Sequence, residues 1–151
     1  MATFACSLVT PERVLVDAAF QAVFLRTGLG EAAFLPGHTP LVGSVAPGMV
    51  RFQHEDGTEE RAAVHGGFVQ VAGDTVTVLA PVAELAGEID VERARRALDA
   101  AGQRITELGA ARAGPSDSGD AAPAHAVTEA EAAQRRAEVR LEVAGAGDGR
   151  A

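Results

Sequence analysis

The amino-acid sequence predicts an N-terminal antiparallel β-sandwich or flattened barrel followed by a C-terminal α-helical hairpin. Apolar residues alternate with period two as far as about Ala80, and beyond Pro81 they recur every three or four residues. Turn-forming residues divide the first region into short strands, as in an antiparallel sandwich. We therefore expect a β-sandwich domain at residues 1–85 and a helix-linker-helix domain at residues 86–151, with the linker at about 113–127.

The strands follow from the alternation and from the turns that interrupt it. Two series of large residues alternate with smaller or polar neighbours: Phe4, Cys6 and Leu8, then Phe20, Ala22 and Phe24. Turns are expected at Thr10-Pro11, Gly28-Leu29-Gly30, Pro47-Gly48, Asp56-Gly57 and Gly73-Asp74. The Asp-Gly pair between two strand-like runs is a strong hairpin signal. The last strand should end near Ala80, because Pro81 cannot extend a central strand.

The first helix is predicted between about residues 90 and 112. Its apolar stripe consists of Ile89, Ala94, Leu98, Ala101, Ile105 and Leu108, largely at alternating spacings of three and four. The following segment, to about residue 127, contains Gly, Pro, Ser and Asp with almost no large apolar residue. That composition is typical of a flexible linker.

The second helix is expected to begin at Thr128, because Glu131 three residues later completes a capping box. Its apolar stripe is narrow and consists of Ala133, Ala137, Leu141 and Ala144. A fully buried Leu side chain stabilises a protein by about 1.5–3 kcal/mol, and an alanine methyl by much less. We therefore expect the hairpin to dock weakly and to exchange between packed and extended forms.

Composition and charge exclude several classes of function. The net charge is −8, whereas a nucleic-acid-binding protein needs a basic face. All 13 basic residues are Arg, so a Walker-type phosphate loop, a Schiff-base enzyme and a protein kinase would each lack their lysine. We expect no membrane span, since no uncharged apolar segment reaches about 18 residues. We also expect no signal peptide, and the single Cys6 fits a reducing, cytoplasmic compartment.

The motifs of common active sites and metal sites are incomplete in this chain. The segment from Gly28 to Ala33 fits a dinucleotide-binding pattern, but Pro36 follows where that motif requires a helix. Glu59 and Glu60 should point to opposite faces of a strand rather than form an acid/base pair. No metal-ligand spacing is shared by the histidines, which are His38, His54, His65 and His125. We expect no catalytic residues, no metal site and hence no enzyme.

The segment from Phe34 to Leu41 is predicted to form a rigid corner between two strands. Pro36 and Pro40 fix the backbone φ near −65°, and Gly37 permits angles that other residues avoid. His38 lies at the apex of the corner. The residues alone leave two interpretations of His38 open: a turn residue bonded to a nearby backbone group, or part of a binding surface.

In order and spacing, this corner and the segments after it resemble the epsilon subunit of the F-type ATP synthase. The later segments are Pro47 to Arg51, Val64 to Val71 and Thr75 to Ala80, and the match runs from about Leu8 to about Ala101. The resemblance implies a non-catalytic, central-stalk rotor subunit that couples proton transport through the membrane ring to ATP synthesis. It also implies that the hairpin restrains ATP hydrolysis, and that the protein lies peripherally on the cytoplasmic face of the bacterial cell membrane.

The resemblance also assigns partners to particular residues. Contact with the gamma subunit of the central stalk would fall on the corner residues Pro36, Gly37, His38 and Pro40. Contact with the membrane c-ring would fall on the loop from Gly28 to Glu31. The arginines of the second helix would reach the alpha/beta catalytic head. Ala33 departs from the family, because many members have Gly there.

A second candidate site lies at the start of the first helix. Asp90 and Arg93 share one face, so Asp90 either caps the helix with Arg93 as its partner or takes part in nucleotide binding. The segment from Ile89 to Ala94 resembles the motif through which some epsilon subunits bind ATP. By that resemblance, a regulatory ATP would be held by Ile89, Asp90, Arg93 and Ala94, together with Arg135, Arg136 and Arg140. The alternative to a rotor subunit is a free-standing β-domain module that senses ATP through its hairpin.

Overall fold

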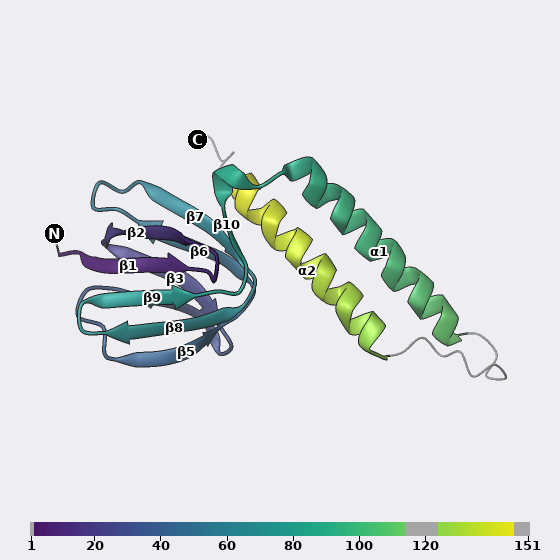
Figure 1. The fold of residues 1–151 in the computed structure, drawn as a ribbon, viewed down its shortest axis with the longest axis horizontal. Coiled ribbons are helices and arrows are strands. Elements are labelled where there is room, and N and C mark those ends of the chain that lie inside the picture. Colours follow the sequence, from purple (N-terminus) through teal and green to yellow (C-terminus); the bar gives the residue numbers. More distant parts are fainter. Residues whose placement is uncertain (1, 114–123, 147–151) are drawn as a thin grey trace.

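The computed structural model describes residues 2–113 and 124–146, in which two helices project from one end of a ten-stranded β-sandwich (Figure 1). The elements follow in the order β1 (Phe4–Val9), β2 (Val14–Phe20), β3 (Ala22–Thr27), β4 (Gly30–Phe34), β5 (Leu41–Val45), β6 (Gly48–Gln53), β7 (Glu59–Val64), β8 (Gly67–Ala72), β9 (Thr75–Leu79), β10 (Ala83–Leu85), the 3₁₀ helix η1 (Ala86–Glu88), α1 (Val91–Ala113) and α2 (Ala124–Ala146). This architecture confirms the predicted fold class.

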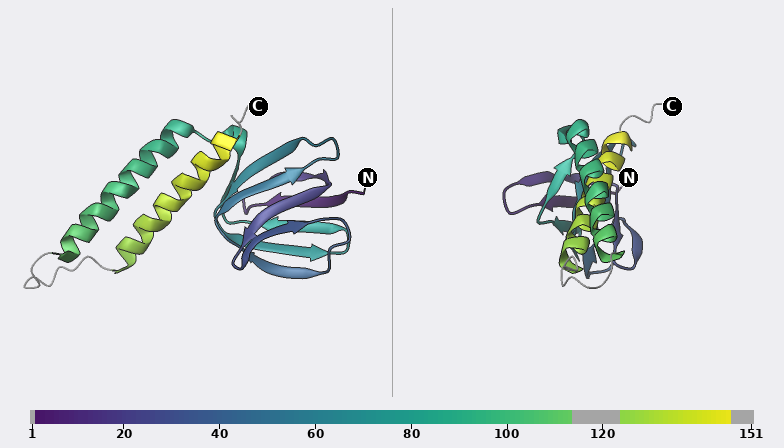
Figure 2. Two further views of the ribbon diagram at one scale, coloured as in Figure 1. Left: turned by 180° about the vertical axis from the view of Figure 1, so that it is seen from behind. Right: turned by 90° about the vertical axis from the view of Figure 1, so that its right-hand side faces the viewer.

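The strands form two layers that wrap around a common interior (Figure 2). One layer has the order β10-β7-β6-β3 with β4 also paired to β3, and the other has the order β5-β8-β9-β1-β2. The layers join where Thr27 of β3 pairs with Val45 of β5. Among the described strands, β1 and β9 form the one parallel pair. Alternation along the sequence carries no information about strand direction, so this pair was not predicted.

The interior is built from the inward residues of the alternating strands. The series predicted on β1 is buried throughout. The second predicted series was wrong at Phe24, which is half-buried on the outer face, where the Arg51 guanidinium lies 4.6 Å from the centre of its ring. The chain turns at Gln21 between β2 and β3, and the buried residues of β3 are Ala22, Val23 and Leu25.

The turn chemistry explains where the strands end. Gly57 has a φ of +84° between β6 and β7, and Asp56 Oδ1 accepts hydrogen bonds from the Thr58 N–H at 2.9 Å and the Thr58 hydroxyl at 2.6 Å. This is the predicted Asp-Gly hairpin. At the start of β8, a Cβ on Gly67 would lie 2.0 Å from the Leu79 carbonyl oxygen. Only glycine permits β8 to pass this close to the end of β9.

One strand lies beyond the expected end of the sheet. In β10, Ala83 lies opposite Val64 and Leu85 lies opposite Ala62 of β7. Pro81 falls in the connection before β10, as its chemistry requires. A strand of three residues is too short to show a period, and therefore the sequence pattern missed it.

An ion pair holds η1 to the sandwich. Arg13, in the β1–β2 turn, donates hydrogen bonds from both terminal guanidinium nitrogens to the two carboxylate oxygens of Glu88, at 2.8 and 2.5 Å. Glu88 also accepts a bond from the Leu85 N–H at 3.2 Å. The hydrogen bonds from Arg13 lower the pKa of the Glu88 carboxyl group, because they favour its charged form. The chain is thus fixed to the sandwich as far as Glu88.

The first helix matches its prediction, and the second begins earlier than predicted. On α1, three positions of the expected stripe are buried, namely Ala94, Ala101 and Leu108. α2 begins at Ala124, whose carbonyl oxygen accepts a bond from the Thr128 hydroxyl at 3.2 Å. Thr128 therefore lies inside the helix, and the predicted capping box was wrong. Residues 124–127 of the predicted linker are helical, and residues 114–123 lie outside the described part of the chain.

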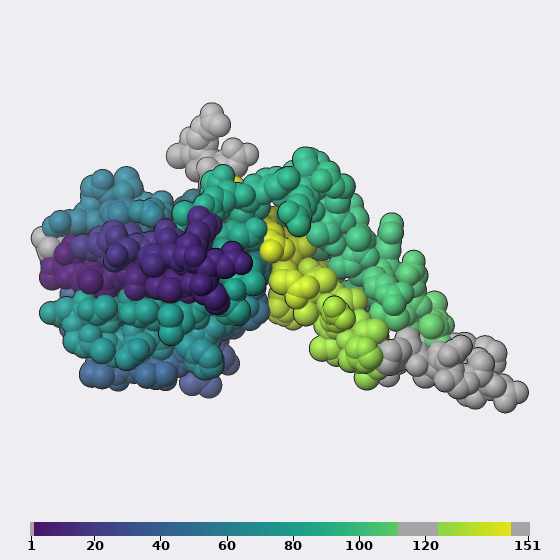
Figure 3. Space-filling view, viewed as in Figure 1, coloured from purple at the N-terminus to yellow at the C-terminus, as the bar shows by residue number. Residues whose placement is uncertain are grey.

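α2 lies between the sandwich and α1, which is on the far side of the hairpin (Figure 3). Val139 and Val143 of α2 are buried with Ala63 of β7 and with Ile89, and we call these four residues the docking cluster. The predicted alanine stripe missed both valines. Ala137 is also buried, and at about 100° per residue it lies on the opposite side of the helix from Val139. α2 thus buries two faces, one of which the sequence pattern did not reveal.

Candidate interaction surfaces

The loop from Gly28 to Glu31 is a tight turn between β3 and β4. The Thr27 hydroxyl accepts a hydrogen bond from the Leu29 N–H at 3.2 Å and donates one to the Gly30 carbonyl oxygen at 2.9 Å. Leu29 is fully exposed at the tip of the turn. The turn joins two strands and opens no helix, so its glycines cannot act as a dinucleotide-binding motif.

The predicted corner is present between β4 and β5. The His38 N–H donates to the Leu35 carbonyl oxygen at 3.1 Å, and Gly37 has a φ of +81°. Pro36 and Gly37 therefore occupy the central positions of a turn that favours these residue types. His38 Nδ1 lies 2.8 Å from the Thr39 carbonyl oxygen, and its ring packs edge-on against Phe34 with 5.0 Å between ring centres. The corner is rigid, and the half-exposed His38 has the backbone partner that one of the two interpretations expected.

β4 separates the two predicted contact surfaces. The Gly28–Glu31 turn lies at its first end and the corner follows its last residue, Phe34. The five residues of β4 span about 14 Å at about 3.4 Å per step. The structure therefore keeps these surfaces apart and does not merge them into one site.

A third surface, not anticipated from the sequence, is the apolar patch on the outer face of β5, β8 and β9. Val42, Phe68 and Leu79 are 72%, 61% and 47% exposed. Phe68 lies opposite Leu79, and with Pro11 and Pro81 these two residues help to line a shallow hollow of about 540 Å³. The signal was present in the sequence, because an inward Val69 requires an outward Phe68. Grouped apolar residues on an outer face are typical of a protein interface.

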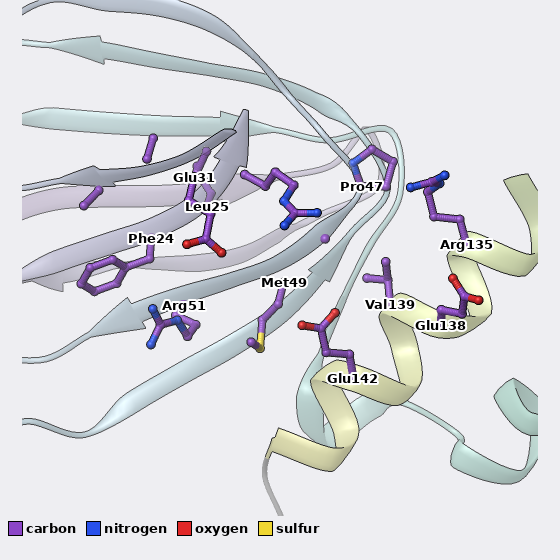
Figure 4. A pocket seen from close by; sticks show the side chains of 14 residues that line it. Phe24, Leu25, Glu31, Pro47, Met49, Arg51, Arg135, Glu138, Val139 and Glu142 are labelled. Carbon is purple, nitrogen blue, oxygen red and sulfur yellow. The ribbon is translucent and has the colours of Figure 1, made fainter. Parts of the chain in front are cut away.

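A groove of about 370 Å³ runs between α2 and the strands β3, β4 and β6. Figure 4 shows Arg135, Glu138 and Glu142 of α2 facing residues of the sandwich across the groove. Arginines and glutamates are equal in number among its lining residues, which include Arg26, Arg51, Arg135, Glu31, Glu138 and Glu142. The structure thus places Arg135 here, whereas the sequence grouped it with Asp90 and Arg93.

The start of α1 has the geometry of a helix cap. Asp90 Oδ1 accepts a hydrogen bond from the Arg93 N–H at 3.0 Å, which satisfies one of the free donors of the first turn. Ile89 and Ala94 are buried, and Ile89 belongs to the docking cluster. Arg93 is exposed, and its guanidinium has no ion pair within the described residues. The cap that the sequence offered as one interpretation is therefore present.

The junction between the sandwich and α2 contains a second group of charges. Arg140 Nε donates a 2.5 Å hydrogen bond to Glu84 Oε2, and the same oxygen lies 3.6 Å from His65 Nε2. The pKa of His65 is lowered, first by burial and then by the positive charge of Arg140, while Glu84 opposes the shift. Arg136 also lowers it. Of the predicted nucleotide-binding arginines, Arg136 and Arg140 therefore lie near His65.

The described residues offer neither a membrane span nor a metal cluster. In residues 2–113 and 124–146, no helix is long and apolar enough to cross a membrane. The same part of the chain brings no three His, Cys, Asp or Glu side chains together as metal ligands. Burial raises the pKa of the Cys6 thiol to about 12, so this group is not an activated nucleophile.

The fold and its surfaces define a class of protein: a β-sandwich with an attached helical hairpin that presents several separate candidate contact surfaces. The family model of the ATP synthase Delta/Epsilon chain β-sandwich domain matches residues 3–86. An ATP synthase epsilon chain from Symbiobacterium thermophilum is 42% identical, and the alignment covers 98% of this chain and 97% of the relative. The chain therefore belongs to the ATP synthase epsilon chain family, and this membership identifies it as a non-catalytic subunit.

Two solved structures have the same fold over nearly the whole chain. One comes from the Euglena gracilis mitochondrial ATP synthase OSCP/F1/c-ring, with a TM-score of 0.75, 24% identity and coverage of 95% of this chain and 82% of that one. The other comes from the Tetrahymena thermophila mitochondrial ATP synthase central stalk/c-ring, with a TM-score of 0.56, 12% identity and coverage of 93% and 95%. The pairing of sandwich and hairpin thus recurs at low sequence identity.

Proposed function

We propose that this protein is a central-stalk rotor subunit that couples proton transport through the membrane ring of an F-type ATP synthase to ATP synthesis. The observation that carries the proposal is the match to an epsilon chain over the whole chain, hairpin included. The two solved structures of the same fold come from F1/c-ring and central stalk/c-ring assemblies, which supports it. In this role the protein lies peripherally on the cytoplasmic face of the bacterial cell membrane.

In this proposal the sandwich connects the stalk to the membrane ring. The gamma subunit binds the corner at Pro36, Gly37, His38 and Pro40, and the c-ring binds the turn from Gly28 to Glu31. The separation of these surfaces by β4 supports two different partners. β4 is paired to β3 along its length, which supports a stiff connection between the two surfaces.

The apolar patch extends the gamma-binding surface in this proposal. The corner leads directly into β5, and Leu35 and Leu41 on either side of it are 54% and 38% exposed. Val42, Phe68 and Leu79 add exposed apolar residues on the outer face of β5, β8 and β9. A buried apolar centre beside a rigid polar corner is the usual anatomy of a stable protein interface.

The hairpin acts as a brake on ATP hydrolysis in this proposal. Its extended form reaches the alpha/beta catalytic head through the arginines of α2, a contact that weakens with salt. The small docking cluster supports an equilibrium between docked and extended forms. A regulatory ATP bound at Asp90 and Arg93, with Arg136 and Arg140, would hold the docked form.

Co-purification tests the central proposal. The tagged chain is produced in a bacterium that lacks its own epsilon subunit, and we expect a large membrane ATPase to purify with it. Phe68→Asp should weaken this association, whereas Val14→Asp, at a 56% exposed position on β2, should leave it unchanged. A folded chain that purifies alone would instead support a free-standing ATP sensor.

A further inference from the structure

A buried imidazole lies at the junction where α2 meets the sandwich, and the proposed function does not use it. The side chain of His65 is only 4% exposed, and both of its ring nitrogens are buried without a hydrogen-bond partner among residues 2–113 and 124–146. Buried polar groups are nearly always hydrogen-bonded, so such an exception points to a specific role.

The charges that face His65 come from two elements that move apart if α2 leaves. Glu84 belongs to β10, which is part of the sandwich, while Arg136 and Arg140 belong to α2. Glu84 Oε2 accepts the bond from Arg140 and lies 3.6 Å from His65 Nε2, beyond hydrogen-bond distance. When His65 is neutral, the Glu84 carboxylate pairs with Arg140.

A proton on His65 changes this balance. The protonated ring becomes a second cation beside the oxygen that Arg140 already occupies, with Arg136 as a third positive charge nearby. The single Glu84 carboxylate, whose side chain is 32% exposed, cannot compensate all of these charges, and the positive groups repel one another. The repulsion ends when α2 carries Arg136 and Arg140 away from His65.

We propose that His65 is a proton-sensitive latch for the C-terminal hairpin, whose protonation releases α2 from the sandwich. The inference rests on the proposed function in that it concerns the same movement of the hairpin. It adds the regulating signal, which is the proton concentration around the subunit, and the group that senses it.

The direction of the pH effect follows from linkage. An exposed His in the released form has a pKa near 6.5, and the docked form lowers it. The docked form is therefore favoured fully above about pH 6.5, and this advantage is lost as pH falls through the lower pKa of the docked form. Between pH 7.5 and 5.5 the docking equilibrium constant should fall by up to about tenfold.

The structure also indicates where the chain bends on release. The ion pair between Arg13 and Glu88 keeps η1 on the sandwich, and α1 begins at Val91. Ile89 and Asp90 form the connection between these fixed elements. Opening there exposes the docking cluster, including Val143.

Labelling of Val143→Cys measures the release in the isolated full-length chain. The position is fully buried when α2 is docked, so a methanethiosulfonate reagent reports the open population. Cys6 is buried and its raised pKa keeps it unreactive. Each labelling rate at position 143 is divided by the rate for a free thiol at the same pH. We expect this ratio to rise by up to about tenfold from pH 7.5 to 5.5.

The matched variants are His65→Gln and His54→Gln, each combined with Val143→Cys. In the His65→Gln variant, the relative labelling rate should change by less than about twofold between pH 7.5 and 5.5. His54 pairs with Glu60 at 2.7 Å, away from the junction, so His54→Gln should respond as the parent does. An NMR titration of the His65 ring in the unmodified chain should give a pKa below that of an exposed His.

Three results would overturn the latch: a rate independent of pH in the parent, an equal response in His65→Gln, or a ring pKa at or above about 6.5. Both measurements use the isolated chain, without stalk or ring. They can therefore fail while the central-stalk role stands, and the co-purification can fail while they succeed.

Discussion

The two hydrophobic clusters of this protein differ in size and in kind. The sandwich interior contains Phe4, Phe20, Phe34 and Phe52 together with a series of valines. The docking cluster consists of one alanine, two valines and one isoleucine, with no aromatic residue among its members. Since stabilisation grows with the apolar area buried, the sandwich should persist under conditions in which the hairpin leaves it.

The polar contacts follow the same division. η1 is tied to the sandwich by two charge-assisted bonds between Arg13 and Glu88. The corresponding contact of α2 is the bond between Arg140 and Glu84, whose acceptor oxygen also lies 3.6 Å from His65 Nε2. In our proposal, one region is permanent, and the other is held by contacts that a proton or a ligand can change.

The largest expected effect separates the clusters directly. Phe52 is fully buried and its ring centre lies 5.3 Å from that of Phe20, so Phe52→Ala should lower the free energy of unfolding by about 3–5 kcal/mol. Val139→Ala should leave the unfolding of the sandwich nearly unchanged and increase labelling at position 143. Urea denaturation followed by circular dichroism measures the first effect. Equal losses in both variants would show that the clusters unfold as one unit.

Nucleotide binding would be a further difference between the hairpin and the sandwich. If Arg93 contacts phosphate, Arg93→Ala should weaken ATP binding by about 1.5–3 kcal/mol, or roughly ten- to a hundredfold. Calorimetry of the isolated chain at millimolar ATP measures this. Arg51→Ala on the sandwich and Arg135→Ala in the groove should have no effect. Absence of heat in the parent would leave Asp90 as a helix cap and nothing more.

A smaller effect is expected at the corner, which belongs to the permanent region. Combining His38→Ala with Pro36→Ala should weaken assembly by about 1–2 kcal/mol, because a flexible corner loses more entropy on binding. The thermal midpoint of the isolated chain should change little. The measurement pairs complex formation with thermal unfolding. A large fall in the midpoint with assembly intact would make the corner purely structural.

The smallest effect on the sandwich should come from removing the hairpin altogether. Truncation after Leu85 should leave residues 1–85 folded, because the docking cluster lies outside the main interior. The truncated subunit should still couple rotation but no longer restrain hydrolysis. Circular dichroism checks the fold, and a second truncation after Ile89 retains the Arg13–Glu88 pair as a control. An unfolded first fragment would overturn the division at residue 85.

The sequence predicted local features well because local chemistry determines them. Alternation on β1, the Asp56-Gly57 hairpin and the Pro36-Gly37 turn depend on residues that are neighbours in the chain. The Phe24 error arose at a place where one strand ends and another begins within a single residue. A period alone cannot locate such a break.

Features that depend on distant contacts escaped prediction. β10 exists because β7 offers a free edge, and Val139 is buried because the sandwich covers it. Likewise, Glu84 and Arg140 are far apart in sequence, and no spacing rule connects them or His65. The corner and the β3–β4 turn were found from turn chemistry, whereas the charged junction required the fold.

The parallel pair of β1 with β9 has a consequence for how the protein is made. Ala5 lies opposite Thr75, so the N-terminal strand cannot complete its pairing until nearly the whole sandwich has been synthesised. Synthesis proceeds at about 5–20 residues per second, so several seconds pass in which β1 is paired with β2 before β9 has been made. During that time one edge of the β1–β2 hairpin is open to other chains. Closure of the sandwich is therefore a late, non-local event, and the two helices, whose contacts are local, form much faster once they emerge.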